Sequence, residues 1–225
     1  MTYGLRILKR KRAVDLELAK EFLDVPVANV SDCMSRMASG GARLRPMHAG
    51  GRMAGPALTV KTRPGDNLMI LKALMLAKPG DVIVVDAGGD LTNSLIGEIM
   101  VGDAILKKVA GMVINGAIRD SEEIRSMNFP VFAAGVTHRG PYKDGPGEIN
   151  VPIAIDGMVI EPGDLVIGDG DGLLCVPFDD AQALLNAAHQ KQKIEEKMVA
   201  EIGDGTYDRS WVDATLTRMN CYIEA

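Results

Sequence analysis

The chain has 225 residues, of which 47% are hydrophobic and 24% are charged, and its formal net charge is −5. This composition is typical of a protein with a well-formed apolar core, and the length suits one large domain with helical extensions. The acidic balance argues against a nucleic-acid-binding surface, and no apolar run reaches the length of a membrane span. Since the N-terminus also lacks the apolar region of a signal peptide, we expect a cytoplasmic protein that binds neither nucleic acid nor membranes.

The three cysteines, Cys33, Cys175 and Cys221, are far apart and form no C-x-x-C pair. This pattern argues against a disulfide framework and against a structural zinc site. Cys175 lies in an apolar run over 173–176, which favours a buried small hydrophobe over a nucleophile.

In chain order, apolar residues at helical spacing first predict an amphipathic helix over residues 14–24. Ser31 is then a candidate N-cap for a second, short helix that ends at the pair Gly40-Gly41. An alternating run rich in β-branched residues predicts a strand over 57–62.

The tripeptide Pro-Gly-Asp occurs three times, at 64–66, 79–81 and 162–164. Pro presets a turn angle, Gly tolerates a positive φ and Asp binds nearby amides, so each copy predicts a turn. The first copy precedes an apolar helix predicted over 68–77, and the other two lead into strands. Because their spacing is irregular, these are reused turns and not a solenoid repeat.

The middle of the chain alternates short apolar strands with helices. The pattern predicts a strand at 82–86, a helix at 94–110, a strand at 112–115, a helix at 120–127 and a strand at 130–134. This order indicates parallel crossover units.

After residue 150 the pattern becomes richer in strands. The runs 151–155 and 158–160 flank Asp156-Gly157, a strong signal for a hairpin, and strands near 164–168 and 172–177 follow. We therefore predict a mixed α/β core with a β-rich second half, forming one domain over residues 1–178.

Residues 179–225 are predicted as a separate extension, with one long polar helix over 179–202 and a tail from Gly203. The helix has few apolar positions to bury in its own domain. Such a helix can be solvated or can lie over a neighbouring subunit, and the sequence leaves both interpretations open.

The most prominent candidate for chemistry is the pair Arg119-Asp120, which follows an apolar strand and Asn115-Gly116. Ligands of α/β sheets bind beyond the carboxyl ends of strands, so Arg119 could bind an anion and Asp120 a metal ion. Alternatively, Asp120 caps the helix 120–127, and Arg119 pairs with Glu122 or Glu123.

A second candidate segment is Gly97-Glu98-Ile99-Met100, because a glycine inside an otherwise helical stretch often marks a close backbone approach to a ligand or another element, although a packing role is just as common. The sequence has no P-loop, dinucleotide-binding fingerprint or two-histidine zinc motif. The three histidines are isolated, so they are more consistent with structural roles. A metal ligand set would therefore consist of oxygens, which favours Mg²⁺ or Mn²⁺.

The motif series in this chain resembles that of the ribonuclease-E-activity regulator A family. The similar segments are V-I-V-V-D-A-G-G-D at 82–90, G-E-I-M at 97–100 and G-A-I-R-D at 116–120, with further matches at 130–133, 162–164 and 168–172. The resemblance covers roughly residues 25–205. The family includes class II 4-hydroxy-4-methyl-2-oxoglutarate and 4-carboxy-4-hydroxy-2-oxoadipate aldolases. It implies a swivelling β/β/α fold, assembled as a homotrimer or a homohexamer.

The resemblance also implies roles for single residues. Residues 97–100 would hold the substrate carboxylate, largely through backbone amides, Arg119 would bind the 2-oxo acid and Asp120 would ligate the metal. A C-terminal glutamate would reach a neighbouring subunit's site, with Glu195 as the best match and Glu196 as its competitor. Aldolases of this group often have Asp where Glu98 stands, which affects the shape of the pocket.

These roles predict a lyase that cleaves a 4-hydroxy-2-oxo acid to pyruvate and a second 2-oxo acid, and that also decarboxylates oxaloacetate. A divalent metal and Arg119 would stabilise the enolate charge. Glu98, or Glu195 from a neighbour, would orient the water that deprotonates the 4-hydroxyl. The alternative is a non-catalytic, protein-binding regulator of ribonuclease E activity. A methyltransferase is disfavoured, since the sequence has no convincing motif for a methyl donor.

Overall fold

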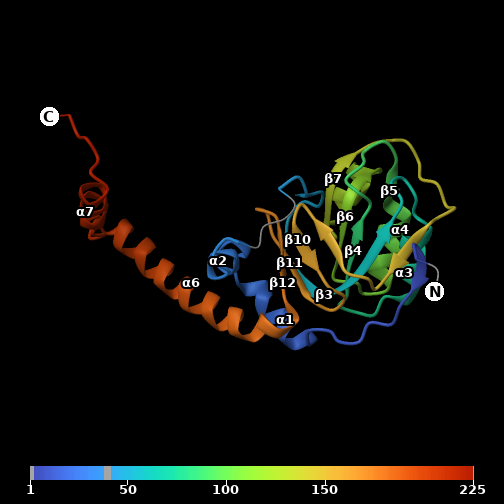
Figure 1. Ribbon diagram of the computed structural model, residues 1–225, viewed down its shortest axis with the longest axis horizontal. Helices are drawn as coiled ribbons and strands as arrows, with labels where there is room; N and C mark the ends of the chain where they lie inside the picture. The colour runs from blue at the N-terminus through green and yellow to red at the C-terminus, as the bar shows by residue number, and fades with distance from the viewer. Residues whose placement is uncertain (1–2, 38–41, 225) are drawn as a thin grey trace. The chain divides into compact units, whose positions relative to one another are not determined.

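Strands and helices alternate along most of the chain, which the computed structural model describes over residues 3–37 and 42–224 (Figure 1). Two compact units, Met1–Ala188 and His189–Ala225, make up the chain. The elements of the first unit are β1 (Leu5–Ile7), α1 (Leu16–Glu21), the 3-10 turn η1 (Phe22–Asp24), α2 (Val27–Cys33), β2 (Arg45–Pro46), β3 (Met53–Thr62), α3 (Leu68–Leu76), β4 (Val82–Asp86), β5 (Ser94–Ile96), α4 (Glu98–Leu106), β6 (Gly111–Ile118), α5 (Ser121–Met127), β7 (Val131–Val136), β8 (Gly147–Ile149), β9 (Ile153–Ile155), β10 (Met158–Ile160), β11 (Leu165–Gly168), β12 (Leu173–Val176) and the 3-10 turn η2 (Phe178–Asp180). Helix α6 (Ala181–Gly203) starts in the first unit and continues into the second, which also holds α7 (Ser210–Arg218).

The centre of the main sheet is made by β3, β4, β6 and β7, which lie side by side in that order and run parallel. Strands β4 and β6 are in register from Val82 opposite Gly111 to Asp86 opposite Asn115. Helices α4 and α5 follow β5 and β6 in the chain, as parallel crossovers require. The predicted α/β class and the crossover units over 82–134 are therefore confirmed.

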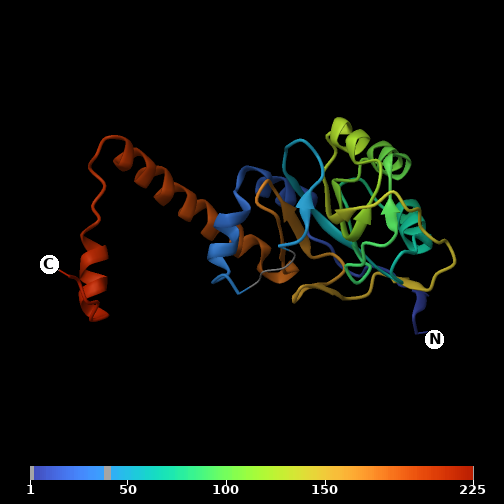
Figure 2. The same cartoon turned by 90° about the horizontal axis from the view of Figure 1, so that it is seen from above.

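The central strands separate two apolar cores because successive side chains point to opposite faces. On β4, Ile83 and Val85 belong to the core under α3, α4 and α5, whereas Val82 and Val84 belong to the core beneath β9–β12. Figure 2 shows α4 and α5 on one side of the sheet and the N-terminal helices on the other. A third core packs α1, η1, α2 and the start of α6 on β11 and β12. The resulting layers are helix, sheet, sheet and helix.

Several local predictions are confirmed by this architecture. The Asp156-Gly157 pair joins β9 and β10 into an antiparallel hairpin, and both residues have positive φ angles of 48° and 90°. Cys175 is buried in the second core, and burial raises the pKa of its thiol far above the ordinary value. This inert environment agrees with the predicted structural role.

Other predicted boundaries are wrong. Residues 94–96 form strand β5 instead of the start of a helix, because Ser94 and Ile96 pair with the buried strand β6. Helix α4 then begins at Glu98, with Gly97 as its N-cap residue. Ser31 caps no helix, since it lies inside α2, which begins after Pro26. The predicted end of that helix at Gly40-Gly41 lies outside the described residues.

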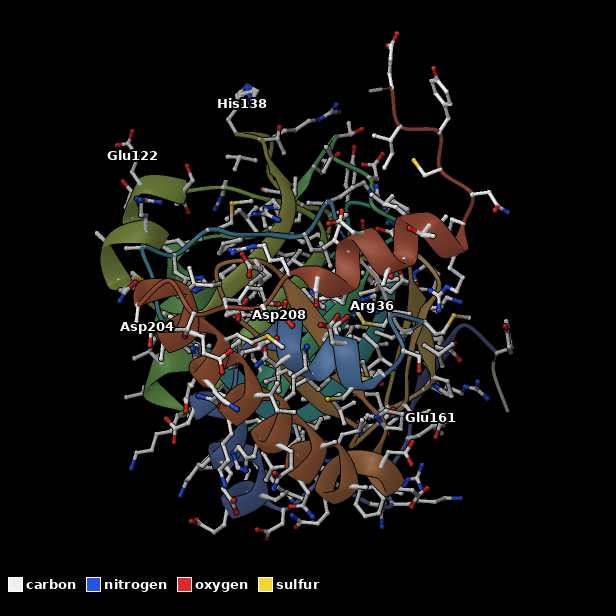
Figure 3. The ribbon with its side chains drawn as sticks, turned by 90° about the vertical axis from the view of Figure 1, so that its left-hand side faces the viewer. Arg36, Glu122, His138, Glu161, Asp204 and Asp208 are labelled. Carbon is white, nitrogen blue, oxygen red and sulfur yellow. The ribbon has the colours of Figure 1, made fainter. Side chains whose placement is uncertain are left out.

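The second unit is also more helical than predicted, because the tail contains α7. Between α6 and α7, Asp204 accepts hydrogen bonds from Thr206 and Asp208 accepts them from Ser210, which closes two local turns (Figure 3). These hydrogen bonds lower the pKa of both aspartates. Over residues 3–37 and 42–224, no helix combines the length and the apolar character that a membrane span requires.

The third Pro-Gly-Asp turn ties the N-terminal segment to β3. Gly163 donates to Ala57 O at 2.9 Å, and its own carbonyl accepts from Val14 N at 2.9 Å. Its φ is +96°, and a Cβ at this position would overlap the carbonyl oxygen of Arg12. Glycine is therefore required here both by the backbone angle and by a close approach.

We expect Gly163→Ala to lower the free energy of unfolding by about 3 kcal/mol or more, because the clash adds to the strain. Gly157→Ala is the matched control, since Gly157 has a φ of +90° but nothing within 4 Å of a Cβ. Strain alone predicts a loss of about 1–2 kcal/mol there. Urea denaturation of both variants measures the difference, and equal losses would contradict the close approach at Gly163.

Candidate active site

A cavity of about 350 Å³ lies where the start of α3, the start of α4 and the end of β6 meet. Arg119, Asp120 and Gly97 line it together with a loop over 140–143. The other lining residues are Asn67, Leu71, Leu95, Ile96, Ile99, Met100, Gly140, Pro141 and Lys143. The structure thus brings most of the predicted site residues into one cavity.

Asp120 occupies the N-cap position of α5 but makes no side-chain capping bond to that helix. Its φ of 53° is left-handed, and the carboxylate turns toward α4 instead, where Oδ2 accepts from Glu98 N at 3.1 Å. The same oxygen lies 3.5 Å from Arg119 Nε. The capping interpretation is therefore right about the position and wrong about the helix that is capped.

The pairing of Arg119 with Glu122 or Glu123, which that interpretation also included, is wrong. Arg119 instead interacts with the adjacent Asp120. Glu122 points from α5 away from the sheet (Figure 3). The Arg119 side chain is 42% exposed, so its guanidinium remains accessible to a ligand in the cavity.

Gly97 makes this arrangement sterically possible. A Cβ on Gly97 would overlap Asp120 Oδ2 and would lie 3.1 Å from both Cγ and Nε of Arg119. Its φ of −147° is ordinary extended backbone, so the glycine is required by the close approach and not by the angle. The predicted close backbone approach is confirmed, and the approaching group is the Arg119-Asp120 pair.

The segment 97–100 presents the N-terminal turn of α4 to the cavity. This end of a helix carries a partial positive charge that favours anions. Ile99 and Met100 line the cavity, whereas Glu98 does not. Glu98 is exposed, and within the described part of the chain its side chain makes no hydrogen bond or ion pair.

Asp120 is the acidic side chain of the cavity lining. Its Oδ1 has no hydrogen-bond partner among the described residues, so one carboxylate oxygen is free for a cation. Residues 3–37 and 42–224 contain no cluster of three or more His, Cys, Asp or Glu side chains suited to a metal. The donor set fits an ion that binds one carboxylate and takes its other oxygens from water or ligand, as Mg²⁺ commonly does.

His48, for which the sequence favours a structural role, and the candidate Glu195 are not among the lining residues of the cavity. His48 is buried and its Nδ1 lies 3.1 Å from Val131 O, which agrees with a structural role. Glu195 lies on α6 in the second unit, where its carboxylate pairs with Lys191 at 2.8 Å. Its predicted contact with a neighbouring subunit stays a prediction.

The sequence interpretation missed Asn67 and Lys143, which also line the cavity. Neither residue belongs to a recognisable motif, and they meet only because the loop over 140–146 packs against the start of α3. Tyr142 N donates to Gly65 O at 2.8 Å, and Asn67 N donates to Tyr142 O at 3.0 Å. The available signal was the Pro-Gly-Asp turn that immediately precedes Asn67.

Asp66, the aspartate of that turn, anchors the loop over 140–146 to the start of α3. Asp66 is fully buried, and its Oδ2 accepts from Asp144 N and Gly145 N, both at 2.8 Å. Its Oδ1 accepts from Leu68 N at 3.0 Å, and Arg63 lies 3.1 Å from Oδ2. Burial alone would raise the pKa of Asp66, but the amide hydrogen bonds and Arg63 outweigh it, so that the pKa lies below its ordinary value.

We expect Asp66→Asn to lower the free energy of unfolding at pH 7 by about 1–3 kcal/mol, because one amide oxygen cannot replace the ionised acceptor. Because the pKa of Asp66 is lower in the folded than in the unfolded protein, ionised Asp66 stabilises the fold at pH values above its unfolded-state pKa of about 3.9. This stabilisation disappears as the pH falls through the folded-state pKa. The difference between wild type and variant should therefore shrink below about pH 4. Urea denaturation between pH 7 and pH 3 measures this difference in the free energy of unfolding. A difference that does not change with pH would contradict an ionised Asp66 in the folded protein.

Known proteins with similar sequences and structures agree with the motif resemblance. The family model described as RraA-like, Aldolase/RraA, matches residues 27–175. A protein of Halalkalibacterium halodurans, provisionally named a 4-hydroxy-4-methyl-2-oxoglutarate aldolase, is 38% identical over 190 residues, which are 84% of this chain and 90% of that protein. A Thermus thermophilus protein named 4-hydroxy-4-methyl-2-oxoglutarate aldolase is 36% identical over 126 residues, or 56% of this chain and 76% of its own.

Among solved structures, Streptomyces coelicolor RraAS2 superimposes with a TM-score of 0.75 and 29% identity, covering 82% of this chain and 96% of its own. That protein is described as an unusual member of the RNase ES inhibitor RraA protein family. A link to an RNA-processing enzyme is at odds with the expectation of a protein unconnected with nucleic acid. The matched model and the full-length relative together establish that this chain belongs to the RraA-like family of aldolases and RraA proteins.

Proposed function

We propose that this protein is a divalent-metal-dependent class II aldolase that cleaves a 4-hydroxy-2-oxo acid to pyruvate and a second 2-oxo acid. The proposal rests mainly on one observation: the Asp120 carboxylate keeps a free oxygen beside Arg119 and the N-terminus of α4, inside one cavity. The names of the relatives support the aldolase class. The dependence on metal and the range of substrates are proposals.

Arg119 binds the 2-oxo acid in this proposal. Cleavage of the bond between C3 and C4 leaves an electron pair on the pyruvate half as an enolate. The guanidinium presents a fixed cation with several donors, which stabilises negative charge on the carboxylate and on the developing enolate oxygen. Asp120 limits the freedom of Arg119 through the ion pair between Asp120 Oδ2 and Arg119 Nε, so the charge would need little reorganisation during the reaction.

Asp120 would hold Mg²⁺ or Mn²⁺ through its free oxygen, and the bound ion would supply Lewis-acid stabilisation of the enolate. The positive end of α4 faces the same cavity and would attract the substrate carboxylate to the backbone of Gly97 and Ile99. The substrate would thus be oriented by these backbone amides together with the adjacent Arg119.

Removal of the proton from the 4-hydroxyl requires a base. Glu98 is the nearest candidate in sequence, because it follows Gly97 directly and its carboxylate has no other partner among the described residues. It would act by orienting a water molecule toward the hydroxyl. Glu195 of a neighbouring subunit is the second candidate, and its role would require a homotrimer or homohexamer.

The same site would decarboxylate oxaloacetate. Loss of carbon dioxide from C4 of that acid leaves the electron pair on the same pyruvate enolate. Arg119 would therefore stabilise the enolate charge in both reactions. A second candidate function, inhibition of a ribonuclease by protein binding, is favoured by the similarity to the Streptomyces RraA protein. It predicts partner binding that is unaffected by Asp120→Asn, with no release of pyruvate.

We expect Asp120→Asn to lower kcat/KM for both reactions by about 100-fold or more, because the charged oxygen ligand is lost. Excess chelator should abolish both activities of the wild-type protein, and added Mg²⁺ or Mn²⁺ should restore them. A coupled assay of pyruvate release measures both reactions. Full wild-type activity in excess EDTA would contradict the metal-dependent mechanism.

Gly97→Ala tests the close approach at the reaction centre. The new Cβ would displace the Asp120 carboxylate, so we expect a loss of kcat/KM of roughly 100-fold and, because the capping bond is broken, a loss of about 0.5–2 kcal/mol in the free energy of unfolding. Gly102→Ala on the same helix is the matched control, since a Cβ there meets nothing within 4 Å. It should leave activity unchanged and stabilise the helix by about 0.5–1 kcal/mol. Equal activities of the two variants would argue against the proposed centre.

A further inference from the structure

A second cavity, of about 570 Å³, is formed by the segment that joins β1 to α1, and it is larger than the cavity at Asp120. Figure 1 shows this segment as the dark-blue coil between the two elements. Lys9, Lys11 and Arg12 line the cavity, and Glu161 is the acidic side chain of the lining. The chain as a whole has a net charge of −5, so this cavity differs from the rest of the protein by its excess of cations.

The backbone that forms this cavity is held at both ends. Leu8 N donates to the end of β8 at 3.0 Å, and Val14 N donates to Gly163 O at 2.9 Å. Between these two points, the guanidinium of Arg10 pairs with the buried Asp81 at 2.7 Å. The cavity is therefore preformed, and a ligand that binds there does not have to order the segment first.

Two of the three cations have no partner. Arg12 is paired with Asp179 at 2.9 Å and with Glu161 at 3.3 Å. Lys9 and Lys11 are exposed, and neither forms an ion pair within the described part of the chain. Exposed lysines are common and by themselves indicate no binding site. Here, however, both line one cavity whose nearby carboxylates already bind Arg12, so they are left to attract an acidic group from outside.

The backbone of residues 9–13 is also without partners. It continues β1, which is an edge strand of the main sheet, and none of its N–H groups forms a hydrogen bond to residues 3–37 or 42–224. An exposed edge with free N–H and C=O groups can pair with another extended chain. Lysines at such an edge disfavour neutral and basic strands, whereas an acidic strand pairs with them.

The rest of the cavity is largely apolar, with Leu8, Pro152 and Pro162 in its lining. Apolar surface around a few charged groups is typical of ligand sites. A small inorganic anion would pair with the lysines but would leave the apolar surface uncovered. An extended peptide that alternates acidic and apolar residues would use both features, because its successive side chains point to opposite sides.

We propose that the segment 9–13 binds an extended acidic peptide of a partner protein. The peptide adds alongside the segment as a further strand, and its carboxylates pair with Lys9 and Lys11. This interaction is independent of the proposed aldolase function, because neither lysine lines the cavity at Asp120.

A second copy of this chain is a poorer source of the acidic peptide. The loop between α6 and α7 carries two aspartates, but both close local turns. Asp204 accepts a hydrogen bond from Thr206 N at 3.0 Å, and Asp208 accepts one from Ser210 N at 2.8 Å. This loop would have to lose these hydrogen bonds in order to pair as an extended strand.

The test uses the full chain and a fluorescein-labelled peptide, S-E-V-E-V-E-S, whose binding is followed by fluorescence anisotropy. We expect saturable binding that Lys9→Met/Lys11→Met weakens by about tenfold, because two exposed ion pairs are lost. The neutral peptide S-Q-V-Q-V-Q-S should bind wild type about tenfold more weakly for the same reason. Lys193→Met/Lys197→Met is the matched control, since it removes two exposed lysines of α6 and should leave binding unchanged.

N-methylation of the acidic peptide tests the strand pairing without any change to the protein. Two versions are needed, methylated at the valines or at the glutamates, because only one edge of the peptide faces the segment. Both keep every charge, and the version that loses the facing N–H groups should bind about tenfold more weakly.

Four outcomes would overturn the proposal. The first is that the acidic peptide does not bind at all. Equal binding of all three acidic peptides would indicate a site for anions and not for a strand. Equal binding to wild type and to Lys9→Met/Lys11→Met would place the peptide on another surface. A change of oligomeric state in that variant, measured by sedimentation velocity, would assign the segment to an interface between copies of this chain.

Discussion

The contact between the Asp120 carboxylate and the first turn of α4 is the constraint on which the rest of the site depends. Asp120 follows the buried strand β6, whereas Glu98 begins α4, and the 3.1 Å hydrogen bond between them joins the two elements. Only glycine at position 97 leaves room for that bond. The contact therefore fixes three things together: the entry of α4, the orientation of Arg119 and the direction of the free Asp120 oxygen.

Local energies favour this contact although Asp120 adopts a left-handed backbone. A left-handed residue costs about 1–2 kcal/mol, and Asp tolerates this conformation better than most residues. A carboxylate that caps a helix contributes about 0.5–2 kcal/mol, which offsets the cost. The remaining rigidity comes from packing, since Val101 and Ala104 of α4 are fully buried against the sheet. The strained residue is thus supported by the element that it caps.

Features that depend on local sequence patterns could be predicted from the sequence. Features that depend on contacts between distant segments could not. The apolar strand before Arg119-Asp120 placed this pair correctly at the carboxyl end of β6, and motif resemblance associated it with Gly97. The continuous helix over 94–110 was wrong because a segment as short as 94–96 has no period that separates a strand from a helix. Its pairing with β6 makes it a strand. Lys143 could not be identified from its neighbours in sequence, because its loop is held by a hydrogen bond between Asp144 and Asp66, which are 78 residues apart in the chain.

The elements that line the cavity differ in how they are held. The Arg119 wall is built on a central strand and a buried helix, so its groups are held by packing on both sides. The loop that carries Lys143 is held by backbone hydrogen bonds to Gly65 and Asn67 and by the buried carboxylate of Asp66. Chemistry common to all substrates needs fixed charges, since misplacing a stabilising group by about 1 Å is costly. The position of the loop depends instead on those hydrogen bonds, so it is more sensitive to the loss of a single acceptor such as Asp66.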